Sequence, residues 1–134
     1  MLFHGIDLIE LDRFTAAVAQ HGERFLARVF TEAEREACGG RTQSLAARFA
    51  AKEAVAKLLG VGIRGLGAGE RGASTLGWHE IEVLRDQAGR PTVCLRGRAA
   101  ERAATLGAGE IALSLSHTRG CAVASAVAMQ EHDS

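Results

Sequence analysis

Residues 48–60 read RFAAKEAVAKLLG, and this stretch decides most of what the sequence predicts. The run is rich in alanine, contains no proline and ends at Gly60, a pattern typical of a helix that stops at a glycine. Side chains four positions apart share a helix face, so Glu53 and Lys57 are expected to lie side by side. Such a pair can serve a metal ion and a phosphate together, although it is also common on solvated helix faces.

The residues before this stretch predict one strand followed by helices. Residues 2–11 read LFHGIDLIEL. Apolar side chains occur at both odd and even positions, which predicts a strand that is covered on both faces. Thr31, with Glu34 three positions later, matches a capping box and therefore marks the start of a helix. The helical segments expected in this half are 13–20, 23–30, 31–39 and 43–59.

The second half of the chain predicts two β-hairpins around another helix. Residues 61–77 hold six glycines, but they lack the GK[ST] ending and the strand–loop–helix context of a phosphate-binding loop, so we interpret them as a flexible surface loop. The elements expected after this loop are a hairpin at 78–85 and 90–95, a helix at 97–106, and a hairpin at 110–117 and 121–129. Small residues dominate the last strand, which predicts close packing against it, inside one subunit or between subunits. The tail, residues 130–134, is expected to fray.

The order of these elements predicts an α+β fold. No regular alternation of strand and helix appears, so we expect a mainly antiparallel sheet packed against one long and several short helices, in a single domain over residues 1–134. The first ten residues contain Asp7 and Glu10, unlike a signal peptide, and no apolar run reaches the length of a membrane span. We therefore expect a cytoplasmic protein without a membrane partner.

Charge and aromatic content argue against a nucleic-acid partner. The formal net charge is zero, aromatic residues make up 4% of the chain and tyrosine is absent. A nucleic-acid binder requires a basic surface, and a single-strand binder also requires exposed rings. Cys38, Cys94 and Cys121 lie far apart without metal-ligand spacing, which predicts three free thiols in a reducing compartment.

Asp7 and His117 are polar residues in apolar strands. An ionised Asp7 between Ile6 and Leu8 requires a cation, a metal or several hydrogen-bond donors, so both a structural and a functional role are open. His117 ends its strand beside Thr118. It is either a structural residue whose polar atoms are satisfied within the fold, or it holds a phosphate.

Four stretches together resemble one known family. They are GIDLIELDRF (5–14), ERFLARVFTEAE (23–34), RFAAKEAVAKLLGVG (48–62) and LSLSHT (113–118). In this order and at this length they resemble the short bacterial holo-acyl-carrier-protein synthases of the 4′-phosphopantetheinyl transferase superfamily, over about residues 3–128. The resemblance implies the fold of that superfamily. It also implies magnesium-dependent transfer of 4′-phosphopantetheine from coenzyme A to a serine of apo acyl carrier protein, with release of adenosine 3′,5′-bisphosphate, in fatty-acid biosynthesis.

The resemblance also implies roles for the residues that match its motifs. Asp7 and Glu53 match the metal ligands, and Lys57 matches the lysine that steadies the phosphates. Two carboxylates suffice for magnesium, which retains water and substrate oxygens, and manganese favours the same ligands. Glu53, directly or through a water, is the expected base for the serine proton. We thus expect Glu53 and Lys57 to be catalytic.

Further residues are implied to bind the two substrates. Those expected to bind coenzyme A are Arg48, Lys52, His117 and Thr118. Arg48 and Lys52 are one helical turn apart and form either a basic edge or a solvated face. Those expected to meet the acidic carrier protein are Arg13, Arg24 and Arg28. Phe14, Phe25 and Phe49 either contact the carrier or pack in the core. A homotrimer is also implied by the family.

Two alternative functions remain open at this stage. The same chemistry could act on carriers of a polyketide or peptide assembly line, and the loop at 61–77 could alter carrier preference. A non-catalytic module that binds carriers or coenzyme A belongs to a different class. Because Asp7, Glu53 and Lys57 are all present, the sequence favours the enzyme.

Overall fold

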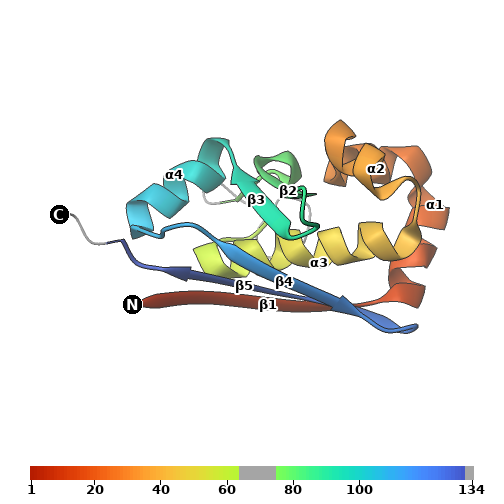
Figure 1. Ribbon diagram of the computed structural model, residues 1–134. Coiled ribbons are helices and arrows are strands. Elements are labelled where there is room, and N and C mark those ends of the chain that lie inside the picture. The colour runs from red at the N-terminus through yellow and green to blue at the C-terminus, as the bar shows by residue number, and fades with distance from the viewer. Residues whose placement is uncertain (64–74, 132–134) are drawn as a thin grey trace.

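The fold is seen in a computed structural model, which describes residues 1–63 and 75–131 (Figure 1). Most of the loop expected at 61–77 and most of the tail expected to fray lie outside the described residues. The elements are β1 (Leu2–Glu10), α1 (Leu11–Val29), α2 (Glu32–Cys38), α3 (Thr42–Leu59), the 3-10 turn η1 (Trp78–Glu80), β2 (Ile81–Arg85), β3 (Pro91–Leu95), α4 (Gly97–Leu106), β4 (Ala112–His117) and β5 (Cys121–Met129).

The strands form two antiparallel sheets on opposite sides of α3. The larger sheet has the order β1-β5-β4, and the smaller consists of β2 and β3. In Figure 1, α3 runs along one face of the larger sheet. The elements β2, β3, α2 and α4 lie on the side of α3 that faces away from this sheet. This arrangement confirms the predicted α+β fold with its mainly antiparallel strands. The predicted long helix is α3, since α1 is broken at Gly22.

The last strand packs closely against α3, as its small residues predicted. One face of β5 consists of four alanines that are at most 2% exposed: Ala122, Ala124, Ala126 and Ala128. Small side chains let a helix approach a sheet closely. This face of β5 is therefore covered inside one chain.

The prediction that β1 is covered on both faces is wrong. Its inner face carries the buried Gly5 and the half-buried Asp7, but Leu2, Ile6 and Leu8 on the outer face are 66%, 52% and 61% exposed. The only helix that lies along this sheet covers its inner face in the described part of the chain. The apolar outer face of β1 is therefore left open to solvent in one chain.

Local signals placed the helix boundaries well. Gly22 adopts φ 57° and ψ −138°, which breaks α1 into the two predicted segments. The predicted capping box is confirmed, because Thr31 Oγ1 accepts from Glu34 N and Glu34 Oε1 accepts from Thr31 N. The strand expected at 78–85 instead begins with the turn η1, where the Glu80 carboxylate accepts from Gly77 N and Ala99 N.

None of the helices in residues 1–63 and 75–131 combines the length and the apolarity needed to cross a lipid bilayer.

Candidate active site

The packing of α3 on β1 brings Asp7, Glu53 and Lys57 together. Lys57 Nζ donates to Asp7 Oδ1 at 3.1 Å and to the carbonyl oxygen of Ile6 at 3.0 Å. The charge of Asp7 also acts on Glu53, one helical turn from Lys57. Two carboxylates and one ammonium thus meet where the middle of β1 faces α3.

Glu53 is held in an environment that disfavours its charge. Burial, reinforced by the negative charge of Asp7 and opposed by Lys57, raises the pKa of Glu53 to about 7. Its Oε1 is buried and has no hydrogen-bond partner among the described residues. A buried carboxylate oxygen without a donor is costly, so the site favours a cation at this position.

The residues fit a divalent metal that prefers oxygen ligands. Asp7 and Glu53 supply carboxylate oxygens, and no group of three or more His, Cys, Asp or Glu side chains suitable for a metal occurs in the described parts of the chain. Magnesium and manganese accept one or two protein carboxylates and take their other ligands from water and substrate. Structural zinc sites, by contrast, use four protein ligands.

Lys52 does not face a substrate, so the prediction that it binds coenzyme A is wrong. Its side chain is 0% exposed, and its Nζ lies 2.8 Å from Glu34 Oε1. The same ammonium donates to the carbonyl oxygens of Trp78 and Ile81 at 3.0 and 2.6 Å. Burial lowers the pKa of Lys52, while Glu34 opposes this shift. All three donors of the ammonium are therefore used inside the protein.

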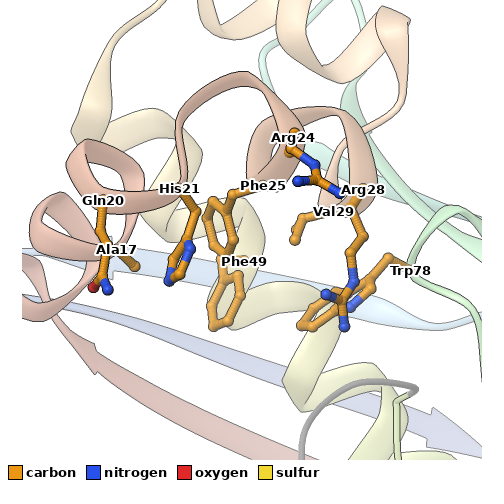
Figure 2. A pocket seen from close by; sticks show the side chains of 9 residues that line it. All are labelled: Ala17, Gln20, His21, Arg24, Phe25, Arg28, Val29, Phe49 and Trp78. Atoms are coloured by element: carbon orange, nitrogen blue, oxygen red, sulfur yellow. The ribbon is translucent and has the colours of Figure 1, made fainter.

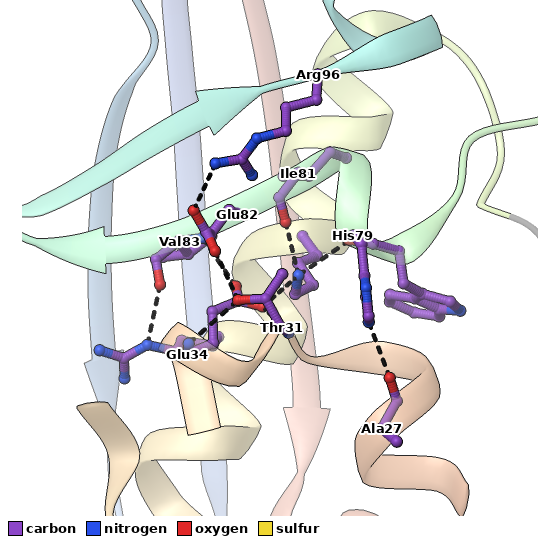
Figure 3. A network of polar contacts seen from close by, with 11 residues as sticks. Ala27, Thr31, Glu34, His79, Ile81, Glu82, Val83 and Arg96 are labelled. Atoms are coloured by element: carbon purple, nitrogen blue, oxygen red, sulfur yellow. Dashed lines mark hydrogen bonds and ion pairs between the residues drawn. The ribbon is translucent and has the colours of Figure 1, made fainter. Parts of the chain in front are cut away.

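Arg48 lies on the same buried side of α3. It is 4% exposed, and its Nε donates to the carbonyl oxygen of Val83 at 3.1 Å. Glu34 also accepts from Val83 N at 2.8 Å, and Figure 3 shows this network between α2 and β2. Arg48 and Lys52 therefore form neither of the two expected arrangements, a basic edge or a solvated face, because α2 and β2 cover this side of α3. A coenzyme A-binding role for Arg48 stays a prediction without support from its position.

His117 and Thr118 lie away from the carboxylates. Thr118 Oγ1 accepts from Gly120 N and Cys121 N at 3.2 Å, which closes the β4–β5 turn. His117 is exposed at the end of β4 and lines a pocket of about 400 Å³. Its other lining residues are Arg41, Gln43, Ser44, Ala47, Arg85 and Leu115. Asp7, Glu53 and Lys57 do not line this pocket.

Arg41 and Arg85 were missed by the sequence analysis. Together with His117 they make this pocket cationic, which suits an anion. Arg41 directly precedes α3. The helix dipole favours acidic residues at that place, so a basic residue there was a usable signal of an anion-binding role. Arg85 ends β2, and nothing in the sequence brings it near His117.

Arg24 and Arg28 border a second pocket, of about 630 Å³ (Figure 2). Phe25, Phe49 and Trp78 give this pocket apolar walls, and the rings of Phe49 and Trp78 stack at 5.0 Å. The full set of lining residues is Ala17, Gln20, His21, Arg24, Phe25, Arg28, Val29, Phe49 and Trp78. An apolar groove with guanidinium groups at its border suits an acidic amphipathic helix.

Two other residues of the expected carrier surface lie elsewhere. Arg13 is exposed on α1 but does not line the groove. Phe14 is 2% exposed and packs edge-on against Phe25, Phe30 and Phe49. Phe14 is therefore a core residue, whereas Phe25 and Phe49 belong both to the core and to the groove.

Comparison with known proteins places these features in one family. The family model described as 4′-phosphopantetheinyl transferase superfamily matches residues 4–124. The chain is 53% identical to the holo-[acyl-carrier-protein] synthase of Chloroflexus aggregans, over 96% of this chain and 95% of that protein. It is 48% identical to the synthase of Moorella thermoacetica, over 98% and 94%.

Solved structures agree with this comparison. The fold is similar to the Chronobacterium ammoniagenes ACPS–CoA complex, with a TM-score of 0.80 and 31% identity, over 98% of this chain and 99% of that one. It is also similar to the Helicobacter pylori holo-[acyl-carrier-protein] synthase in complex with coenzyme A, with a TM-score of 0.76 and 25% identity, over 94% and 99%.

Proposed function

The chain belongs to the holo-acyl-carrier-protein synthases of the 4′-phosphopantetheinyl transferase superfamily, and we propose that Asp7, Glu53 and Lys57 form its active site. The enzyme transfers the 4′-phosphopantetheine group of coenzyme A to apo acyl carrier protein. The observation that carries the proposal is the buried, unpartnered Oε1 of Glu53 in the field of Asp7. We further propose that the whole of residues 1–134 forms this one transferase domain.

Asp7 and Glu53 are the proposed ligands of magnesium, for which manganese can substitute. When bound, the ion withdraws charge from the pyrophosphate of coenzyme A. Lys57 is 56% exposed and donates to Asp7 from a flexible side chain, so its ammonium can also reach a phosphate oxygen beside the carboxylates. There it stabilises the charge that develops on the leaving adenosine 3′,5′-bisphosphate.

Proton transfer is assigned to Glu53. The serine oxygen of the carrier attacks the β-phosphorus of coenzyme A, the bond to the leaving phosphate breaks, and the serine proton passes to Glu53 directly or through a water. Burial and Asp7 raise the pKa of Glu53 to about 7 in the metal-free site. A bound metal ion would lower this pKa again, so the route through a water keeps the proton acceptor next to Glu53.

The 3′-phosphate of coenzyme A is proposed to bind at the cationic pocket of His117, Arg41 and Arg85, next to Thr118. Asp7, Glu53 and Lys57 do not line this pocket, and we propose that a second copy of the chain completes the site. The open outer face of the larger sheet, where Leu2, Ile6, Leu8 and Met129 are 52–69% exposed, supports such an assembly. We propose a homotrimer with active sites at the subunit boundaries.

The acidic carrier is proposed to dock on α1. Arg24 and Arg28 border the apolar groove, and Arg13 lies on the same helix nearer to β1. Electrostatic complementarity of this kind orients an acidic helix and accelerates its association. The groove accepts apolar side chains of the carrier, while the three guanidinium groups meet its carboxylates.

The client is proposed to be the acyl carrier protein of fatty-acid biosynthesis, in the cytoplasm. All three cysteines are free, which supports a reducing compartment. Carriers of polyketide or peptide assembly lines are the second candidate. Comparing kcat/KM for purified apo carriers of each class tests this choice, and a preference of more than about tenfold for an assembly-line carrier would overturn the fatty-acid assignment.

A further inference from the structure

Gly5 lies where the backbone of α3 rests directly on β1. A Cβ atom at Gly5 would lie 1.9 Å from the carbonyl oxygen of Ala54 and 2.7 Å from Leu58 N. The φ angle of Gly5 is not positive, so the position requires glycine for its space and not for its backbone conformation. Any larger residue at this position must push strand and helix apart.

This contact lies among the residues of the active site. The three α3 atoms nearest to such a Cβ belong to Ala54 and Leu58, the residues that directly follow Glu53 and Lys57. On the strand, Gly5 precedes Ile6, whose carbonyl oxygen accepts from Lys57, and stands two positions before Asp7. The contact at Gly5 therefore holds the turn of α3 with Glu53 against the part of β1 with Asp7.

The neighbouring strand continues this close approach. Ala126 pairs with Gly5 and Ala124 pairs with Asp7 across the β1–β5 ladder, and both alanines are 0% exposed. We call Gly5, Ala124 and Ala126 the small-residue seat of α3. Because protein interiors are densely packed, the size of these three residues sets the distance between α3 and the sheet.

We propose that Gly5, supported by Ala124 and Ala126, is a positioning residue that sets the separation of the Asp7 and Glu53 carboxylates. This inference rests on the metal site of the proposed function. An alanine Cβ at position 5 would have to move from 1.9 Å to at least the 3.0 Å that real Cβ atoms keep, a displacement of about 1.1 Å. Magnesium demands near-ideal octahedral geometry, and a misplacement of about 1 Å can cost about 100-fold in function.

The test measures metal binding without turnover. Manganese(II) is titrated into the full-length protein without coenzyme A or carrier, and the free ion is followed by electron paramagnetic resonance. Gly5→Ala is expected to weaken manganese affinity at least about tenfold. Gly120→Ala is the matched control, because a Cβ there meets nothing within 4 Å and its φ is not positive, and it is expected to bind like the wild type. A folded Gly5→Ala variant with wild-type affinity would overturn the proposal.

A milder variant keeps the proposal testable if Gly5→Ala does not fold. Ala126→Val adds two methyl groups to the seat, and its side chain can adjust, so a loss of about threefold in manganese affinity is expected. Ala99→Val makes the same change at a fully buried alanine of α4 and is expected to have no effect on metal binding. If the folded Ala126→Val and Ala99→Val proteins bind manganese equally well, the small-residue seat does not position the metal ligands.

An Asp7→Asn variant separates failure of this inference from failure of the proposed function. It is expected to abolish the manganese site. If manganese binds equally well without the Asp7 carboxylate, the metal site itself is wrong, and the inference falls with it. If Asp7→Asn abolishes binding while the seat variants bind normally, only the inference is wrong.

Discussion

Lys57 on α3 and Asp7 on β1 form an ion pair at 3.1 Å, although fifty positions separate them in the sequence. The pair places an ammonium beside a carboxylate that is also close enough to raise the pKa of Glu53. Phosphoryl transfer depends mainly on positioning and on charge stabilisation, and these three side chains supply both. Substitutions at each of the three side chains are expected to have different effects.

Removing either carboxylate should stop transfer without unfolding the protein. Asp7→Asn and Glu53→Gln are each expected to lower kcat more than about 100-fold at saturating magnesium, because each removes a metal ligand. Glu53→Gln should leave the melting temperature equal or higher, since it replaces a buried carboxylate whose Oε1 has no partner. Wild-type rates at low magnesium in either variant would contradict the metal assignment.

Lys57→Ala should act on the chemical step. A loss of about 100-fold in kcat is expected, because the lysine stabilises charge that grows in the transition state. The KM for carrier protein should change little, which steady-state kinetics with varied carrier will show. If the variant instead loses carrier affinity with an unchanged kcat, Lys57 does not act on the phosphates.

The metal requirement should depend on pH through Glu53. Its pKa of about 7 means that protons compete with the metal below neutrality. The magnesium concentration for half-maximal rate should therefore rise as the pH falls below about 7, by up to about tenfold per pH unit. Rates measured from pH 6 to 8 with varied magnesium test this dependence, and a constant requirement would refute it.

The same group should affect stability in the opposite sense. Its pKa is raised above the ordinary value of 4.5, so the folded protein binds this proton more tightly than the unfolded chain. The Glu53 contribution to the free energy of unfolding is thus fully present below about pH 4.5 and is lost as the pH rises toward about 7. Glu53→Gln should remove this part of the pH dependence in urea unfolding without magnesium.

Lys52→Met should damage the fold and not the binding of coenzyme A. The substitution leaves Glu34, which is 0% exposed, without its cationic partner, and breaking such a buried pair costs about 3–5 kcal/mol. Lys57→Met, at a 56% exposed lysine, is the control and should change stability by less than about 1 kcal/mol. A stable Lys52→Met protein with weaker coenzyme A binding would restore the original prediction.

The groove on α1 should govern use of the carrier. Arg24→Ala and Arg28→Ala are each expected to raise the KM for carrier about three- to tenfold with little change in kcat or in the KM for coenzyme A. Arg90→Ala, at an exposed arginine of the β2–β3 turn, provides the control. Equal effects of all three substitutions would show that the groove has no special role.

Features with local causes were predictable from the sequence. The capping box at Thr31, the break at Gly22 and the helix end at Gly60 each depend on residues within one turn of the chain. The motif around Glu53 also identified the family correctly. Asp7, Glu53 and Lys57 do come together, because the predicted strand and the predicted helix pack directly against each other.

Features that depend on long-range packing were not predictable. Lys52 looked accessible because its burial depends on α2 and β2, which cover the far side of α3. β1 looked buried on both faces because its outer apolar residues cannot be distinguished, in sequence, from those that face α3. Arg85 joins His117 only through the arrangement of the two sheets.

Transfer by this enzyme is expected to depend on a metal ion held by Asp7 and Glu53. The most direct test is the intact mass of an apo acyl carrier protein after incubation with the enzyme, coenzyme A and magnesium, with EDTA and Asp7→Asn as parallel controls. A gain of one phosphopantetheine group is expected with the wild-type enzyme and magnesium, and no gain in either control. A gain that persists in EDTA or with Asp7→Asn would contradict this expectation.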